Sequence, residues 1–317
     1  MRAPRPIPAT LISLASRQGG LLAASQLDAA DVGAHRRRRL VDAGALQRVT
    51  HGVYDVAPGA LRRDADHRRR RAAWIGLLAY GPGSIAVGSC ALALLGVSGL
   101  PLRIVPEVAL PGGRFGRPRD GIRVRQVRDP VGSTSGAHGI VSVGSALVQA
   151  LPELPRANAV AVLDDCLRRK ILTPEGVEEV RRRLQGRRGT GVLGARVFDR
   201  VDARAESPLE TFARLQCVDA GLPPDQLQVE IRSPDGHFLG RGDLGWRLRN
   251  GGWLIAEIDG REFHETPEAL LHDRRRQNAL VTWGAARVLR FTATDIAAGT
   301  TIPAAIREAI DAGSRTT

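Results

Sequence analysis

Residues 242–264 read GDLGWRLRNGGWLIAEIDGREFH and predict two strands joined by a tight turn. Residues 253–256 (WLIA) form an apolar run that includes the aromatic and β-branched residue types favoured in strands. Gly251 and Gly252 fit the turn, and residues 242–246 fit the strand before it. We therefore expect a β-sheet built around this hairpin.

Three carboxylates are expected together at the end of the hairpin. Strand side chains alternate, so Glu257 and Asp259 project from one face, and Asp243 on the neighbouring strand lies within reach of both. Carboxylates that repel one another and lose solvation need a cation, and oxygen ligands favour Mg²⁺ or Mn²⁺. Such an ion would activate water against a phosphodiester. The alternative is a surface hairpin whose acids face water.

The hairpin and its surroundings resemble the PD-(D/E)xK nuclease superfamily, most nearly its very-short-patch-repair-like endonuclease domains. The resemblance covers residues 206–296 and includes a helix start at residues 207–210 (SPLE) and a last core strand at residues 288–291 (VLRF). It implies a mixed sheet flanked by helices. Asp259 departs from the superfamily pattern, because it stands where a lysine is usual.

The resemblance also implies roles for individual residues. Asp243 and Glu257 would hold the metal, Asp259 would bind a second ion or position the attacking water, and Glu210 would contact metal-bound water. His264 would act as a general acid or phosphate donor, with a structural histidine as the alternative.

Two arginines of the same region are candidates for DNA contacts. Arg290 at the end of the last strand would reach phosphate, and Arg276 lies on an expected helix. A structural pair between Arg276 and Asp273 is the alternative for the second position.

The N-terminal residues 1–60 predict a winged helix-turn-helix. Helices are expected at residues 10–17, 23–28 and 34–43, and Gly44 stops the third. Residues 46–56 contain two short strand-like runs that meet at a turn, which fits a wing hairpin.

The third helix carries Arg36, Arg37, Arg38 and Arg39, and Arg48 lies at the start of the hairpin. Four consecutive arginines surround about one helical turn, so some would meet phosphates and others the groove or solvent. The alternative is a solvated basic face.

Residues 20–54 resemble the N-terminal domain of AbiEi-type antitoxins. The shared pattern is Gly-Leu-Leu, a later Leu, and then Gly-Ala-Leu-x-Arg-Val-x-x-Gly-Val-Tyr. The resemblance implies a domain that binds promoter DNA as a repressor.

Composition and charge fit a soluble globular protein that binds a polyanion. Apolar residues make up 43% and charged residues 25%, with a net charge of +13. Residues 1–75 hold 14 Arg against 6 acids (+8), whereas residues 206–317 hold 13 Arg against 16 acids (−3). The polyanion is therefore expected at the N-terminal part.

No apolar run approaches the roughly 20 residues of a membrane span, and no signal sequence is evident. Cys90, Cys166 and Cys217 are dispersed, which fits a reducing compartment and no disulfide framework. We expect a cytoplasmic protein with no membrane partner.

The remaining regions supply architecture rather than chemistry. Residues 61–155 predict a mixed α/β middle module, with a buried helix at 85–95 and strands at 104–110 and 122–127. Residues 156–205 predict a helical connector to the endonuclease-like domain at 206–317. The expected fold class is α/β (α+β).

Two functions follow from these patterns. The first is a metal-dependent DNA endonuclease of defence or repair, guided by the winged helix to double-stranded DNA. The second is an antitoxin-like DNA-binding regulator whose nuclease fold is silent. A partner protein or a homo-oligomer is a further expectation. The acids favour the first function, and the missing lysine favours the second.

Overall fold

The computed structural model describes residues 5–56, 64–117, 119–127, 131–187, 189–233, 235–259 and 286–314. The chain divides into two compact units. The first unit comprises Met1–Pro155 and Leu172–Gly191, and the second comprises Arg156–Ile171 and Val192–Thr317. The connector expected at residues 156–205 is thus shared between the units. No helix in the described ranges is long and apolar enough to cross a membrane.

The first unit begins with the winged helix-turn-helix that the sequence predicts. Its elements are α1 (Ala9–Arg17), β1 (Leu21–Ala23), α2 (Ala24–Asp28), α3 (Ala34–Asp42), β2 (Gln47–Thr50) and β3 (Val53–Asp55). The strands form an antiparallel sheet in the order β1-β3-β2, and Gly52 turns the wing with φ +73°. The core is apolar and is formed by Leu11, Ala15, Leu22, Leu27, Val32, Leu40, Leu46 and Val56.

The rest of the first unit is the mixed α/β module. Its elements are α4 (Ala65–Tyr80), β4 (Ile85–Ala86), α5 (Gly88–Leu94), β5 (Glu107–Ala109), β6 (Arg123–Arg125), β7 (Val131–Ser135), β8 (His138–Val141), α6 (Val143–Ala150) and α8 (Pro174–Leu184). The sheet order is β6-β5-β4-β8-β7, with β4 parallel to β8 and β5 parallel to β6. The helix expected at 85–95 is shorter, because residues 85 and 86 join the sheet.

A buried ion pair fixes the winged helix to α4. Arg71 Nη2 lies 2.8 Å from Asp55 Oδ2, and Arg71 Nη1 donates to the carbonyl of Gly19 at 2.8 Å. Asp55 is only 2% exposed. Arg71 therefore supplies from α4 the charge that makes the burial of Asp55 tolerable.

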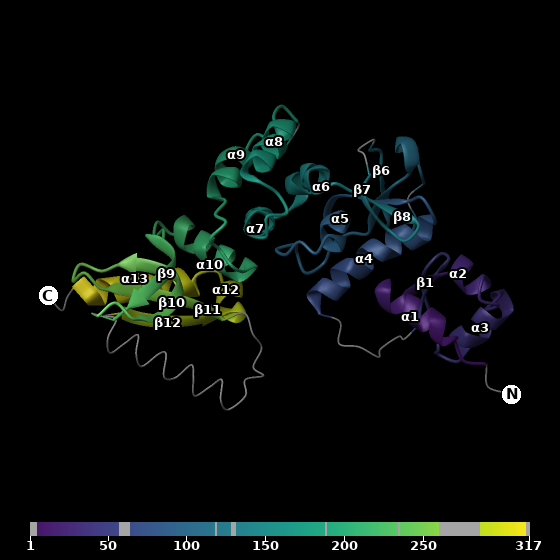
Figure 1. Ribbon diagram of the computed structural model, residues 1–317, viewed down its shortest axis with the longest axis horizontal. Helices are drawn as coiled ribbons and strands as arrows, with labels where there is room; N and C mark the ends of the chain where they lie inside the picture. Colours follow the sequence, from purple (N-terminus) through teal and green to yellow (C-terminus); the bar gives the residue numbers. More distant parts are fainter. Residues whose placement is uncertain are drawn as a thin grey trace. The chain divides into compact units, whose positions relative to one another are not determined.

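The second unit contains a four-stranded mixed sheet. Its elements are α7 (Arg156–Arg168), α9 (Leu193–Arg196), α10 (Pro208–Asp219), β9 (Gln226–Arg232), β10 (Phe238–Arg247), β11 (Trp253–Asp259), β12 (Ala286–Thr292), α12 (Ala293–Ala297) and α13 (Thr301–Ser314). The order is β12-β11-β10-β9, antiparallel except for β11 with β12. Helices α10, α12 and α13 lie along one face of this sheet (Figure 1). The predicted mixed sheet with flanking helices is confirmed.

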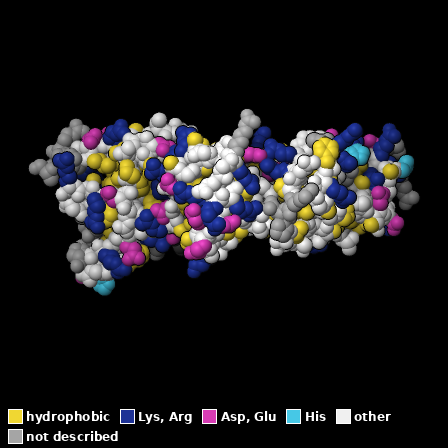
Figure 2. Space-filling view, turned by 90° about the horizontal axis from the view of Figure 1, so that it is seen from above, with side chains coloured by type: hydrophobic (Ala, Val, Ile, Leu, Met, Phe, Trp, Pro, Cys, Tyr) yellow, Lys and Arg dark blue, Asp and Glu magenta, His cyan; other side chains and the backbone are white. Residues whose placement is uncertain are grey.

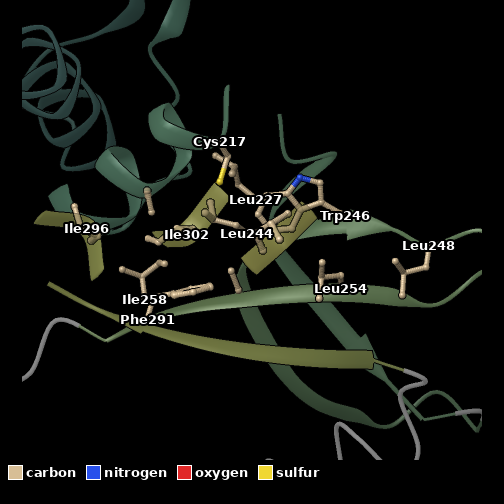
Figure 3. Close-up of a cluster of buried hydrophobic side chains, with 13 residues drawn as sticks. Cys217, Leu227, Leu244, Trp246, Leu248, Leu254, Ile258, Phe291, Ile296 and Ile302 are labelled. Atoms are coloured by element: carbon tan, nitrogen blue, oxygen red, sulfur yellow. The ribbon is translucent and has the colours of Figure 1, made fainter. Parts of the chain in front are cut away.

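An apolar core joins these helices to the sheet (Figure 3). Leu244 and Trp246 of β10 and Leu254 and Ile258 of β11 point into it, as strand alternation requires. Trp246 also donates its indole N–H to a carbonyl at the end of the α10 region, that of Leu222, at 3.1 Å. The other sheet face carries a smaller apolar cluster of Val229, Ile231 and Ile255.

Side-chain alternation is interrupted where β9 pairs with β10. Leu227 packs on the helix-covered face and Val229 on the other, although they are two positions apart. Gln228 between them has a φ of +54°, which is unusual for a residue with a side chain. The register pairs Gly242 with Val229 and Leu244 with Leu227, so the interruption lies opposite Asp243.

Candidate functional site

The four arginines of α3 have different surroundings. Arg36 is folded onto the protein, because its Nη2 donates to the carbonyl of Pro6 at 2.8 Å and to that of Arg5 at 3.3 Å. Its Nη1 donates to the carbonyl of Asp31 at 3.3 Å. Arg36 thus ties the N-terminal segment and the α2–α3 turn to the helix.

Arg37 stabilises the helix-turn-helix from within. Its Nη1 forms an ion pair with Asp28 of α2 and donates to the carbonyl of Val32 at 3.0 Å. Its guanidinium lies 5.9 Å from the ring centroid of Tyr54 in the wing strand β3. Arg37 therefore links the two helices of the motif to the wing.

Arg38, Arg39 and Arg48 are the other cations that the sequence predicts as DNA contacts. Arg38 is exposed, and Arg39 is half-buried. Arg48 on β2 is exposed, and its Nη2 lies 3.1 Å from Nδ1 of His51 at the wing turn. Helix α3 and the wing thus each present positive charge to solvent.

Positive charge alone does not identify this surface as a candidate DNA-binding site. In Figure 2, Lys and Arg side chains occur over many parts of the visible face, with Asp and Glu side chains among them. The position of Arg38 and Arg48 on a helix-turn-helix and its wing is what distinguishes them.

In the second unit, the structure brings Asp243 and Glu210 together. Asp243 Oδ2 accepts a hydrogen bond from the backbone N–H of Ile258 at 2.7 Å. The pKa of Asp243 is raised to about 6, chiefly by burial and in part by the nearby charges of Glu210 and Glu206, against the lowering by the Ile258 N–H and Arg241. Two of the predicted acids therefore repel each other at the start of α10.

Glu210 is held by polar partners around its carboxylate. Its Oε2 accepts from Nε2 of Gln228 and from the backbone N–H of Glu206, each at 2.8 Å. Burial raises the pKa of Glu210, against these hydrogen bonds. The unusual backbone of Gln228 thus places an amide where it meets the helix acid. Sequence reasoning missed Gln228, because nothing in the residue order signals its positive φ.

Glu257 and Asp259 belong to the face of β11 opposite the helices. They alternate along β11 with Ala256 and Ile258, which pack on the helix-covered face. Glu257 is 5% exposed, and its Oε2 lies 3.1 Å from Nε of Arg290, which is aligned with it on β12. Arg290 therefore balances the charge of Glu257, and Asp259 is exposed.

The described residues do not gather a metal-binding trio. Among them, no three His, Cys, Asp or Glu side chains come close enough to hold an ion. Asp243 and Glu210 fit a cation because each is a partly desolvated acid next to the other, whereas Glu257 already has a cationic partner. His264 and Arg276 lie outside the described residues, so their predicted roles stay predictions.

Comparison with known proteins identifies the N-terminal domain. Residues 10–57 match the family described as transcriptional regulator, AbiEi antitoxin. The match coincides with the winged helix, from α1 to the end of β3. The chain therefore begins with a domain of the AbiEi antitoxin family.

Two relatives extend the comparison over most of the chain. They are Uncharacterized protein MT2308 and Uncharacterized protein Rv2248, from the CDC 1551 and H37Rv strains of Mycobacterium tuberculosis. Each is 31% identical over 240 residues, covering 74% of this chain and 80% of the relative. The chain belongs to the same family as these mycobacterial proteins.

Proposed function

We propose that this protein is an antitoxin-type transcriptional regulator that binds double-stranded DNA through its winged helix. The observation that carries the proposal is the family match at residues 10–57, which falls on a complete winged helix. Helix α3 would enter the major groove, with Arg38 exposed on it. Arg48 on the wing would contact the phosphate backbone beside the groove.

Binding by such a surface has a defined salt dependence. Each arginine that neutralises a phosphate releases a condensed counterion, so affinity falls linearly with salt on logarithmic axes. The N-terminal excess of arginine over acid supplies this attraction. Sequence preference would come from the fewer side chains of α3 that reach base edges.

The test is footprinting of the full-length protein on DNA from its own genome, including the region upstream of its gene. We expect protection of discrete sites by wild type and its loss in Arg38→Ala/Arg48→Ala. Arg182→Ala/Arg204→Ala is the control, since it removes the same formal charge from two exposed arginines that are not part of the winged helix. No protection by wild type, or equal protection by all three proteins, would overturn the proposal.

A metal-dependent phosphodiesterase is the second candidate function. It is supported by the meeting of Asp243 and Glu210, whose pKa values are raised by burial. A bound Mg²⁺ or Mn²⁺ would relieve their repulsion and polarise a phosphate oxygen. The lack of a lysine at Asp259 and the pairing of Glu257 with Arg290 weigh against this candidate.

Metal binding and DNA cleavage can be tested separately for this candidate. Mn²⁺ should raise the melting temperature of wild type at pH 8 and leave that of Asp243→Asn unchanged. Plasmid cleavage should then depend on the metal and disappear in the same variant. Equal melting shifts in both proteins, without cleavage, would reject the second candidate and leave the regulator proposal intact.

A further inference from the structure

The connection between β5 and β6 carries an unusual set of side chains. Residues 111–122 read PGGRFGRPRDGI. Arg114, Phe115, Arg117 and Arg119 are all exposed, and Phe115 is 73% exposed. We call residues 111–122 the arginine loop. A single exposed apolar side chain is common on protein surfaces, so the loop is distinguished by the combination of Phe115 with three exposed arginines.

The arginine loop is attached to the wing of the winged helix. Asp120 Oδ2 accepts hydrogen bonds from Oγ1 of Thr50 at 2.6 Å and from the backbone N–H of His51 at 3.0 Å. Both donors belong to the end of β2 and the wing turn. These hydrogen bonds lower the pKa of Asp120.

Further contacts fix the backbone of the arginine loop to the α/β module. The hydroxyl of Tyr80, the last residue of α4, donates to the carbonyl of Arg117. The guanidinium of Arg119 lies 5.2 Å from the Tyr80 ring centroid. A side chain at Gly116 would come within 2.8 Å of Leu110 and 3.3 Å of Val124, which shows how closely the loop packs.

These contacts leave the loop with an excess of cations beside the wing. Asp120 is the only acid in residues 111–122, and it is engaged by the wing. Asp120 therefore joins the wing, which carries Arg48, to the loop, which carries Arg114, Arg117 and Arg119.

We propose that the arginine loop is a second DNA-contacting element, which extends the footprint of the wing onto phosphates that flank the site bound by α3. Arg114 and Arg117 would neutralise phosphates, and Phe115 would lie against a sugar or base edge. The loop is already held in position, so its ordering adds little entropic penalty on binding. The inference rests on the proposed DNA-binding function.

The chemistry of the surface favours DNA over a protein partner. Protein docking surfaces are centred on apolar and aromatic side chains, and although arginine is enriched there, their core is depleted of charge as a whole. Here one aromatic residue is surrounded by arginines and lies next to a predicted DNA-binding wing. Phosphates repeat at a regular spacing along the duplex and fit such a row of cations.

Binding to two DNA duplexes of different length distinguishes the contribution of the arginine loop from that of α3. One contains only the footprinted core site, and the other extends it by about 10 base pairs, one helical turn, on each side. Full-length wild type should bind the long duplex more tightly. Arg114→Ala/Arg117→Ala should abolish this gain and reduce the logarithmic salt slope on the long duplex by about 2, or roughly one per phosphate contact. Phe115→Ala should reduce the gain without changing the slope.

Replacing Asp120 distinguishes two effects on DNA binding, namely the positioning of the arginine loop and the net charge of the surface. Asp120→Ala removes a negative charge, so simple attraction predicts tighter binding of both duplexes. If the bond to the wing positions the loop, Asp120→Ala weakens binding of the long duplex instead. Asp42→Ala is the control, because Asp42 is an exposed acid on α3 and its removal should strengthen binding.

The outcomes are distinct for the two proposals. Wild type that binds neither duplex would overturn both the regulator function and the loop contact. Wild type that binds both duplexes, with loop variants of unchanged affinity and slope, would overturn the loop contact alone. Tighter binding by Asp120→Ala on the long duplex, equal to that of Asp42→Ala, would also overturn it.

Discussion

Arg37 and Arg38 are neighbours in the sequence and perform different tasks. Arg37 holds Asp28, Val32 and Tyr54 together, whereas Arg38 is exposed on α3. The difference arises because consecutive helix residues point about 100° apart. A run of four arginines on one turn is therefore divided between side chains that hold the domain together and side chains that face solvent.

This division predicts opposite phenotypes for adjacent substitutions. Arg37→Ala should lower the stability of the winged helix by about 2 kcal/mol, because charge-assisted hydrogen bonds to Asp28 and Val32 are lost. Arg38→Ala should leave the melting temperature unchanged and weaken DNA binding. Thermal unfolding and fluorescence anisotropy measure the two effects. Equal destabilisation by both substitutions would contradict the assignment.

Asp243 gives a pH-dependent prediction at the same scale. Its pKa is about 6 in the folded protein and near 3.8 when unfolded, so the ionised carboxylate destabilises the fold. The penalty is absent below pH 3.8, grows between pH 3.8 and 6, and is complete above pH 6. Asp243→Asn removes it and should stabilise the protein by about 1–2 kcal/mol at pH 8.

Comparison of wild type with Asp243→Asn isolates this effect. Asp164 also has a pKa raised by burial to about 6, and its contribution cancels because both proteins contain it. Denaturant unfolding at pH 5 and pH 8 should show a larger difference between the two proteins at pH 8. A difference that does not change with pH would argue against a raised pKa.

At the scale of elements, the sequence predicts those helix ends and turns that depend on a residue within the element itself. Gly44 ends α3, Gly52 turns the wing, and Gly251 turns the β10–β11 hairpin, each with a positive φ. Backbone conformations and side-chain pairs that depend on residues far away in the sequence cannot be predicted in this way. The positive φ of Gln228 depends on β10 and α10, and the pairing of Glu257 with Arg290 depends on the β11–β12 register. The sequence predicts Glu257, Asp259 and Glu210 at the same site as Asp243, and the structure places Glu210 near Asp243.

Strand β10 also depends on glycine for its packing. A Cβ at Gly242 would lie 2.2 Å from Cγ2 of Ile255 on β11. Gly242→Ala should therefore destabilise the second unit by about 1–3 kcal/mol through overpacking. In the double variant with Ile255→Ala, the added destabilisation from Gly242→Ala should largely vanish. Urea unfolding of the four proteins of this cycle gives the coupling, and strict additivity would contradict the packing explanation.

At the scale of the whole molecule, the winged helix is a part of the first unit rather than an independent attachment. Arg71 of α4 compensates the buried Asp55, and Asp120 holds the wing turn. The winged helix and the α/β module are therefore linked through a few polar contacts.

Arg71→Ala tests this linkage in the full-length protein. It leaves Asp55 buried with less compensation, so the winged helix should lose about 3 kcal/mol of stability. Hydrogen exchange should accelerate at β1 and β3 and remain unchanged at β10 and β11. Replacing Arg71 by Lys should restore part of the protection, because the charge returns without the second hydrogen bond. Uniform acceleration in both units would indicate a different origin.

The division of the chain into interleaved segments also has a consequence for synthesis on the ribosome. The first unit needs α8, whose Val180 is buried and whose Arg183 lies 3.5 Å from Ser145 of α6. The winged helix is complete by residue 56, but residue 184 emerges roughly 10 s later at ordinary translation rates. During that interval the whole winged helix has emerged, while the module that steadies it through Arg71 and Asp120 is still being completed.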